Sequence, residues 1–313
     1  MDSKQVAEVC SRIIDNIERV IVGKREVVER TMIALMVGGH VLFEDVPGVG
    51  KTMLGRAIAG SIGCKFRRIQ FTPDLLPSDV TGVSIFNQKT GEFAFREGPV
   101  FAGILLADEV NRASPRTQAA LLEAMEEGQV TVDGFSHPLP KPFLVIATDN
   151  PIEYEGVYPL PESQLDRFLL RLHVGYPTRE AEESVVKQQL LEHPIHTLAP
   201  VATAEDVLGL QKQVRTCHVD EALYGYALDI VQKTRESDQL YLGASPRGTL
   251  ALIRSAQALA ALRGRDFVAP DEVKELAPSV LAHRVILRPE ARMNGVAADQ
   301  LIAEIIDEVP VPV

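Results

Sequence analysis

The chain has 313 residues and a formal net charge of −11, from 43 acidic and 32 basic side chains. Hydrophobic residues make up 46% of it, yet it contains no apolar run of about 18 residues, so we predict a soluble globular protein without a membrane span. The net negative charge argues against a broad nucleic-acid footprint, because binding to a phosphate backbone needs clustered Lys and Arg. The net charge is still compatible with a local basic surface.

The beginning of the chain and its cysteines indicate a cytoplasmic protein. Residues 1–24 form a mixed-charge amphipathic pattern without the apolar centre of a signal peptide. Cys10, Cys64 and Cys217 have no metal-ligand spacing, so we expect reduced, structural thiols and neither a metal site nor a disulfide framework. The histidines have no Ser or Cys partner at a recognisable spacing, so covalent catalysis is not predicted.

A glycine-rich loop follows two predicted helices, at 4–20 and 26–37, and a short apolar strand at 41–43. The strand continues into DVPGVGKT, and the next stretch, TMLGRAIAGSIG, has helical spacing. Strand, glycine loop and helix in this order are the context of a phosphate-binding P-loop. Backbone N–H groups at the helix start attract an anion, the ammonium of Lys51 can reach the outer phosphates, and the hydroxyl of Thr52 can ligate Mg²⁺. The residues expected to contact the nucleotide are Pro47, Gly48, Val49, Gly50, Lys51, Thr52 and Met53.

Asp45 departs from the usual pattern GxxxxGK[ST], because it occupies the position of the first glycine. A carboxylate beside triphosphate oxygens would repel them. Either Asp45 lies on the strand side of the turn and points away, or the loop binds nucleotide poorly. We favour the first interpretation, because Gly48 and Gly50 lie closer to the phosphates in this motif.

Two hairpins are predicted after the P-loop helix. A strand at 66–71 leads into a loop in which Ser78 and Asp79 are candidate helix caps. VSIFNQKTGEFAFREGP then reads as a hairpin around Lys89 to Gly91, because alternating apolar residues flank a turn that contains Gly. A second hairpin-like insertion is expected around Asp133 to Pro138.

Two further apolar runs end in polar residues that could bind a metal ion or take part in catalysis. The run from Val100 to Ala107 ends in Asp108 and Glu109, and the carboxyl end of a buried parallel strand is where such sheets bind ligands. Asp108 would hold Mg²⁺, directly or through water, and Glu109 would polarise the attacking water. The next strand, at 144–147, leads to Asn150, whose amide could hydrogen-bond a γ-phosphate or that water. Alternatively, Asn150 and the proline after it only begin a turn.

Three stretches together carry a family resemblance. DEVNRASPRTQAALLEAMEEGQVTVDG, PFLVIATDNPIEYEGVYPLPESQLDRF and DVPGVGKT closely resemble the MoxR family of AAA+ ATPases, and the resemblance extends over essentially the whole chain. Asp at position 45 also occurs in MoxR-like sequences. The family usually has ATQNP in the last of the strands above, where this chain has Asp149 in place of Gln and keeps Asn150.

The resemblance implies roles for individual residues. Lys51 and Thr52 would be Walker A, Asp108 and Glu109 Walker B, and Asn150 sensor 1. Arg167 falls at the arginine finger, which acts on the neighbouring subunit's nucleotide, because a planar cation stabilises the charge that develops on the γ-phosphate.

Two further stretches match the family outside these motifs. Arg247, in GASPRG, matches sensor 2, which reaches from the lid to the γ-phosphate, and Val22 with Gly23 resemble the adenine-contacting stretch. Without the family, Arg167 would read as a surface ion pair with Glu162 or Asp166, and Arg247 as a solvated side chain.

The pattern becomes helical near Tyr176 and Pro177. We therefore expect an α/β domain at 1–177, an AAA+ P-loop core with a parallel sheet and β-hairpin insertions, and an all-α lid domain at 178–313. The lid helices are expected at 179–192, 204–215, 220–236, 246–263, 270–282 and 296–307.

The function that the resemblance implies is an ATP-hydrolysing, Mg²⁺-dependent remodelling chaperone. It would work as a hexameric ring with ATP at the interfaces, and would mature or activate a client protein together with a von Willebrand A domain partner. Two other classes stay open: a nucleotide-gated scaffold with little hydrolysis, and a nucleic-acid motor, against which the net acidity counts. A chelatase-type motor is a closer relative, because it belongs to the same ATP-hydrolysing class as the remodelling chaperone. The chain has no NKxD base-reading motif, which argues against a GTPase.

Overall fold

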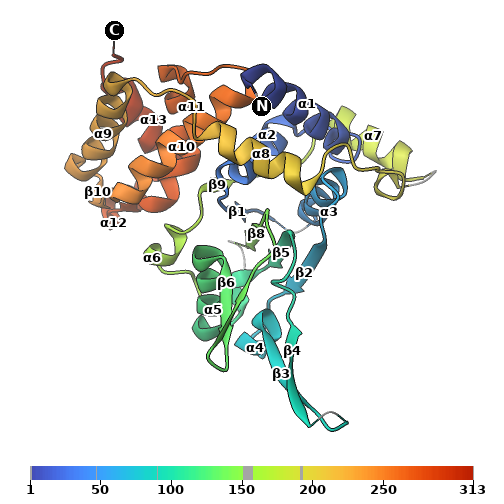
Figure 1. Ribbon diagram of the computed structural model, residues 1–313. Helices are drawn as coiled ribbons and strands as arrows, with labels where there is room; N and C mark the ends of the chain where they lie inside the picture. Colours follow the sequence, from blue (N-terminus) through green and yellow to red (C-terminus); the bar gives the residue numbers. More distant parts are fainter. Residues whose placement is uncertain (1, 47, 90, 151–157, 191–192, 313) are drawn as a thin grey trace.

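A five-stranded parallel sheet lies in the middle of the molecule in Figure 1, between the helices at the top and the hairpins at the bottom. The computed structural model describes residues 2–46, 48–89, 91–150, 158–190 and 193–312. The strand order is β2-β5-β8-β1-β9. The strands are β1 (Val41–Glu44), β2 (Phe66–Gln70), β5 (Ile104–Asp108), β8 (Leu144–Asp149) and β9 (Leu170–Leu172). The three central strands are Val-, Ile- and Leu-rich runs, as expected for a parallel sheet that is covered on both faces.

Alternate side chains of these strands enter two separate hydrophobic layers. Val41 and Phe43 pack with α1 (Ser3–Glu18), α2 (Arg25–Val37) and α3 (Lys51–Ser61) on one face of the sheet. Leu42 points the other way, into the layer that contains α5 (Pro115–Glu127). The carboxyl ends of the strands between these layers form one edge, where ligands of open parallel sheets bind.

Both predicted hairpins are present. Strands β3 (Gly82–Asn87) and β4 (Glu92–Glu97) form the first, and β6 (Gln129–Val132) and β7 (Phe135–Pro138) form the second. The β3–β4 hairpin projects away from the sheet at the bottom of Figure 1.

The region beyond residue 178 contains the predicted helices. They are α7 (Arg179–Gln189), α8 (Ala204–Val214), α9 (Glu221–Glu236), α10 (Pro246–Leu262), α11 (Pro270–Leu281) and α13 (Ala298–Glu308). Helix α10 lies between α11, α9, α1 and α2, and its alanines allow this close packing. The N-terminal helices α1 and α2 also contact α8, so the helical half rests on the first residues of the chain. The boundary between 177 and 178 stays a prediction.

Several short elements were not predicted. They are the strand β9, the helices α4 (Pro77–Thr81), α6 (Glu162–Leu165) and α12 (Pro289–Met293), the 3₁₀ turns η1 (Val110–Arg112), η2 (Pro194–His196) and η3 (Ala282–Arg284), and the strands β10 (Leu240–Leu242) and β11 (Ile286–Leu287). The last two form a small antiparallel sheet inside the helical half. Elements of two to five residues are too short to show a hydrophobic period, which explains why the sequence did not reveal them. Among the described residues, no helix is both long and apolar enough to cross a bilayer.

Candidate functional site

A cleft of about 330 Å³ lies at the carboxyl edge of the sheet. Residues from β2, β5 and β8, from the loop after β1 and from the first turn of α3 line it together. The lining residues are Asp45, Gly48, Gly50, Lys51, Thr52, Arg68, Gln70, Asp108, Glu109, Thr148 and Asn150. We call it the P-loop cleft. It brings together the predicted Walker A, Walker B and sensor 1 positions.

The loop before α3 has the geometry of an anion cradle. Gly48 and Gly50 have φ of 89° and 96°, in the left-handed region that favours glycine, and Gly50 is the N-cap of α3. No described side chain caps this helix, so its first N–H groups are available to a ligand. Val49 packs against the core, and Met53 is half-buried in the first turn. Pro47 lies outside the described residues.

Asp45 points away from this cradle. Its carboxylate accepts hydrogen bonds from the backbone N–H groups of Val174 and Gly175, at 3.1 Å for the latter, and only 9% of the residue is exposed. The negative charge is therefore satisfied by the segment after β9. This geometry supports the interpretation that Asp45 stands on the strand side of the turn.

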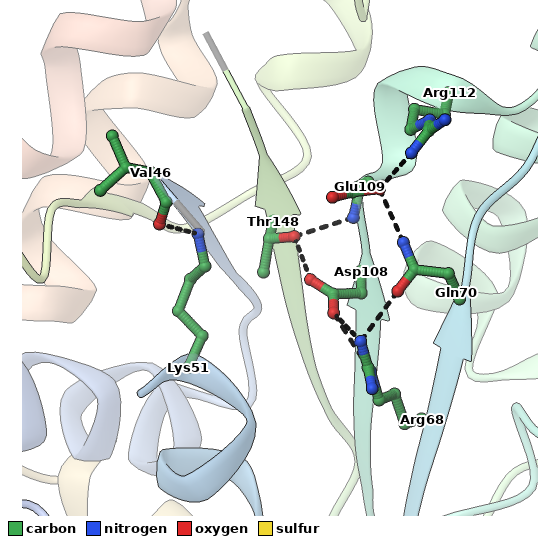
Figure 2. A network of polar contacts seen from close by, with 8 residues as sticks. All are labelled: Val46, Lys51, Arg68, Gln70, Asp108, Glu109, Arg112 and Thr148. Atoms are coloured by element: carbon green, nitrogen blue, oxygen red, sulfur yellow. Dashed lines mark hydrogen bonds and ion pairs between the residues drawn. The ribbon is translucent and has the colours of Figure 1, made fainter. Parts of the chain in front are cut away.

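Lys51 faces the interior of the loop. Its ammonium donates to the carbonyl oxygens of Asp45 at 3.0 Å and Val46 at 3.3 Å (Figure 2). Partial burial lowers the pKa of Lys51, and the carboxylates around the cleft, Asp45 and Asp108 first, oppose that shift. Carbonyl oxygens are weaker partners for an ammonium than phosphate oxygens, so a phosphate can displace them.

Thr148 connects the two acidic residues at the end of β5. Its hydroxyl donates to Asp108 Oδ1 at 2.7 Å and accepts the backbone N–H of Glu109 at 2.8 Å (Figure 2). Glu109 has φ of 57°, an unfavourable value for a residue with a side chain, and this hydrogen bond helps to hold it. The other oxygen of Asp108 accepts two hydrogen bonds from Arg68, at 2.6 and 3.1 Å.

The carboxylate of Glu109 is also occupied by protein groups. Gln70 donates to Glu109 Oε2 at 2.7 Å and Arg112 donates to the same oxygen at 3.0 Å. Arg68 and Gln70 come from the neighbouring strand β2 and are joined by a hydrogen bond of 2.8 Å. The structure thus shows a closed network in which both carboxylates predicted as Walker B have protein partners.

Arg68, Gln70 and Thr148 were missed by sequence reasoning. Arg68 and Gln70 alternate along a predicted strand, which places them on one face, but nothing local shows that this strand lies beside β5. Thr148 lies two residues before Asn150 on β8. Its place on a strand beside the one that ends in Asp108 and Glu109 is the signal that could have indicated its role.

Asn150 lines the same cleft and is 6% exposed. Its neighbour Asp149 is half-buried, and this burial raises the pKa of the Asp149 carboxyl to about 6, with Glu44 adding to the shift. In the sheet, Asp149 stands opposite Glu44 on β1, which explains the repulsion. Among described atoms, Asp149 Oδ1 has no hydrogen-bond partner.

Arg167 and Arg247 meet in a different cleft. This second cleft, of about 240 Å³, lies between α5 and α10 and contains no described P-loop residue. Both guanidinium groups form ion pairs with Glu126, at 3.1 Å for Arg167. Arg167 also donates to the carbonyl of Leu122 at 2.9 Å. The observed partner, Glu126, is neither of the two acids that the simple surface interpretation named.

The segment that carries Arg167 is fixed by the helical half. Asp166 accepts from Arg284 Nε at 2.8 Å and from the hydroxyl of Ser245 at 3.0 Å, two residues before Arg247. Arg284 also donates to the carbonyl of Phe168 at 2.7 Å. Burial lowers the pKa of Arg284, and the charge of Asp166 opposes this. Asp166 therefore joins the segment of Arg167 both to Arg284 and to the start of α10, which carries Arg247.

Val22 and Gly23 lie beside the start of the helical half rather than in the P-loop cleft, whose described lining includes neither. Gly23 has φ of 71°, and a Cβ there would stand 2.9 Å from the Cβ of Ala181 on α7. The next residue, Lys24, donates to the carbonyls of Val174 and Tyr176, the latter at 2.8 Å. The predicted adenine stretch is thus next to the segment that Asp45 binds.

The residues present fit a magnesium–triphosphate group. The uncapped start of α3 and the Lys51 ammonium favour phosphate oxygens, and Thr52 and Asp108 offer the hard oxygen ligands that Mg²⁺ prefers. Among the described residues there is no group of three or more His, Cys, Asp or Glu that would form an all-protein metal cage. Mg²⁺ in phosphate-transfer sites characteristically relies on one or two protein ligands together with the phosphates.

Comparisons with known proteins agree with this geometry. Residues 40–170 match the family model of ATPases associated with various cellular activities, and residues 232–305 match the AAA lid domain. The chain is 55% identical to the uncharacterized protein YeaC of Bacillus subtilis, covering 96% of this chain and 94% of that one. It is 43% identical to the chaperone MoxR1 of Mycobacterium tuberculosis, covering 96% and 82%. A crystal structure from Cytophaga hutchinsonii, assigned as an ATPase, superposes with a TM-score of 0.93 at 39% identity, covering 99% of this chain and 97% of that one.

Proposed function

Because the chain belongs to the MoxR family of AAA+ ATPases, we propose that it binds ATP with Mg²⁺ in the P-loop cleft and hydrolyses it to remodel a client protein. One observation carries the proposal. Lys51, Asp108, Glu109 and Asn150 come from separate parts of the chain and line one cleft at the start of an uncapped helix. This is the arrangement that phosphoryl transfer to water requires.

Each residue has a distinct task in this proposal. Lys51 exchanges its two carbonyl partners for the outer phosphates. Thr52 and Asp108 would hold the Mg²⁺, which neutralises charge on the β- and γ-phosphate oxygens when bound. Glu109 orients and polarises the attacking water once it leaves Gln70 and Arg112. Asn150 hydrogen-bonds the γ-phosphate or that water.

Arg167 and Arg247 are proposed to complete the site of a neighbouring subunit. They share one acidic partner in a cleft apart from the P-loop, so one surface presents both cations. A guanidinium pair of this kind would stabilise the charge that develops on a γ-phosphate. For Arg247, this means that sensor 2 acts between subunits rather than within its own chain.

The wider setting follows from the family. We propose a hexameric ring in the cytoplasm, a division into an α/β domain at 1–177 and a lid domain at 178–313, an adenine contact at Val22 and Gly23, and a von Willebrand A domain partner that supplies the client. The position of the two arginines supports the ring, because they share one acidic partner in a cleft that contains no described P-loop residue of their own chain.

The test is ATP turnover measured against protein concentration, with the mass in solution recorded alongside. Specific activity should rise as rings form and should be lost in Glu109→Gln. Turnover that survives unchanged in both Lys51→Ala and Glu109→Gln would refute the assigned site.

A nucleotide-gated scaffold is the second candidate, and the closed network favours it. Asp108 and Glu109 both have protein partners, which must be displaced before hydrolysis. A protein that binds ATP but shows negligible turnover at every concentration, with rings present, would support the scaffold.

A further inference from the structure

A basic hollow of about 740 Å³ lies between the edge strand β2 and the β3–β4 hairpin. In a chain with a net charge of −11, its walls carry Lys65, Arg67, Arg68 and Arg96 against only two acids, Asp79 and Glu97. We call it the β2-edge groove. Figure 1 shows the two elements that flank it, with β2 above the β3–β4 hairpin. The positive charge of the groove is thus opposite in sign to that of the whole molecule.

Most of this basic charge is unpaired. Lys65, Arg67 and Arg96 are exposed, and within the described parts of the chain none of the three has an ion-pair partner. Asp79 is committed elsewhere, because its carboxylate accepts the backbone N–H of Leu76 at 2.9 Å. Three free cations around one hollow repel each other, so an anionic occupant would be stabilised there.

The backbone of β2 offers a second kind of partner. Strand β2 is last in the sheet, and its outer edge pairs with no described strand. The carbonyl of Lys65 accepts from Ile104 at 3.1 Å and the N–H of Phe71 donates to Asp108 at 2.8 Å, so the odd-numbered residues between them face β5. The N–H and C=O groups of Arg68 and the other even-numbered residues therefore face outward, as a template for another strand.

We propose that the β2-edge groove binds an extended, acidic polypeptide segment, which adds to β2 as a further strand. Main-chain hydrogen bonds supply part of the affinity in such strand addition, and the side chains supply the selectivity. Cations along an open edge turn away apolar and basic strands, so the incoming strand must bring carboxylates.

A polypeptide fits this groove better than a nucleic acid. Nucleic-acid affinity rests on the release of counterions by many phosphate contacts, and three free cations provide few. The outward N–H and C=O groups alternate along the edge, which matches another β-strand and not a sugar-phosphate chain. The inference does not depend on ATP hydrolysis, so it is tested without nucleotide.

The experiment uses the full chain and a fluorescein-labelled peptide of 12 residues, by design, in which Glu and Val alternate. Fluorescence anisotropy should show saturable binding that weakens as salt rises. The double variant Arg67→Glu/Arg96→Glu should bind at least about tenfold more weakly. Lys212→Glu/Arg215→Glu, which makes the same charge change on exposed cations at the C-terminal end of α8, is the matched control and should keep the parent affinity.

Several results would overturn the proposal. Equal weakening in both double variants would show a general charge effect. Tighter binding of a thymidine oligonucleotide of the same length, in competition with the peptide, would assign the groove to nucleic acid. A fall in the mass of the oligomer for Arg67→Glu/Arg96→Glu would assign it to contacts between copies of this chain.

The strand-addition geometry has its own test. The same acidic peptide with N-methyl groups on alternate residues cannot form one edge of main-chain hydrogen bonds, and it should bind several-fold more weakly than the parent peptide. Equal affinity of the two peptides would refute strand addition. Thermal unfolding of each variant, matching that of the parent, confirms that the losses arise at the groove.

Discussion

The groups proposed for catalysis are acidic in the P-loop cleft and basic in the second cleft, and in both clefts they have partners within the chain. In the P-loop cleft, Asp108 is held by Arg68, and Glu109 by Gln70 and Arg112. In the second cleft the signs are reversed, because the single carboxylate of Glu126 holds the cations Arg167 and Arg247. The groups proposed for catalysis therefore have substitute partners in the separate chain. In the proposed ring, each cleft would supply half of the groups for ATP hydrolysis, and subunit assembly would bring the halves together.

The largest effect is expected on the acidic side. Glu109→Gln keeps the size of the side chain and its place beside Gln70, but removes the carboxylate that would activate water. We expect ATP turnover to fall by about 10²-fold or more, with nucleotide binding retained. Phosphate release and the binding of a fluorescent ATP analogue would measure the two quantities. Loss of both together would show that Glu109 supports the fold of the cleft instead.

The basic side should be nearly as sensitive. Arg167→Ala is expected to lower turnover by about 10²-fold or more while ATP still binds, because the cation acts on a neighbour's phosphate. Mixing this variant with Glu109→Gln should restore part of the activity, since some interfaces then combine an intact P-loop with an intact Arg167.

The same mixing experiment decides the side on which Arg247 acts. Recovery on mixing Arg247→Ala with Glu109→Gln places Arg247 across the interface. Activity that stays at the level of the separate variants would place Arg247 at the nucleotide of its own subunit. Of the two arginines in the second cleft, only Arg167 would then act on a neighbour.

Asp149, at the end of β8 next to the P-loop cleft, has a half-buried carboxyl that a pH series can detect. Its pKa is raised to about 6, above the value of 3.8 for an unperturbed group, so the folded state holds the proton more tightly than the unfolded state does. Stability is therefore lost as pH rises from about 4 to 6, and the loss is complete above that range. Asp149→Asn should raise the free energy of unfolding by about 1–3 kcal/mol at pH 7.5 and by much less near pH 4. A stability difference that does not depend on pH would contradict this.

Arg68 stands in the P-loop cleft as a built-in cation on Asp108. Removing it in Arg68→Gln should tighten Mg²⁺ binding several-fold, because the carboxylate no longer has a competing guanidinium. The Mg²⁺ dependence of binding of a fluorescent ATP analogue measures this without turnover. Arg68→Lys, which keeps the charge, is the matched control. Weaker Mg²⁺ binding in Arg68→Gln would mean that Arg68 orients Asp108 rather than competes for it.

The smallest effect is expected at Glu126. Its ion pairs with Arg167 and Arg247 are partly exposed, and such pairs contribute about 0.2–1 kcal/mol each. Glu126→Gln should free both cations and lower the protein concentration at which activity appears by about two- to fivefold. A concentration dependence identical to that of the parent would show that Glu126 does not restrain the arginines.

The sequence predicted the parts of the site that local pattern determines. DVPGVGKT carries its own loop and helix start, and the apolar run before Asp108 indicates a strand whose carboxyl end bears the acids. Their meeting with Asn150 followed from the parallel order of the strands.

The remaining contacts depend on which strands lie side by side. Arg68 reaches Asp108 only because β2 pairs with β5 in a register that places Gln70 opposite Asp108. Arg167 and Arg247 lie far apart in the chain and meet only because Arg284 attaches the helical half to residues 166–169. A single sequence holds no direct sign of such long-range pairs.

Asp45, which departs from the usual P-loop pattern, also joins the P-loop to the connection before the helical half. Its carboxylate accepts the N–H groups of Val174 and Gly175. The ammonium of Lys24 donates to the carbonyls of Val174 and Tyr176. Both the donors and the acceptors of this short connection therefore have side-chain partners. A glycine at position 45 would leave the N–H groups of Val174 and Gly175 without this partner. With aspartate there, a displacement of the loop by a phosphate would pull on the connection that leads into the helices beyond residue 178.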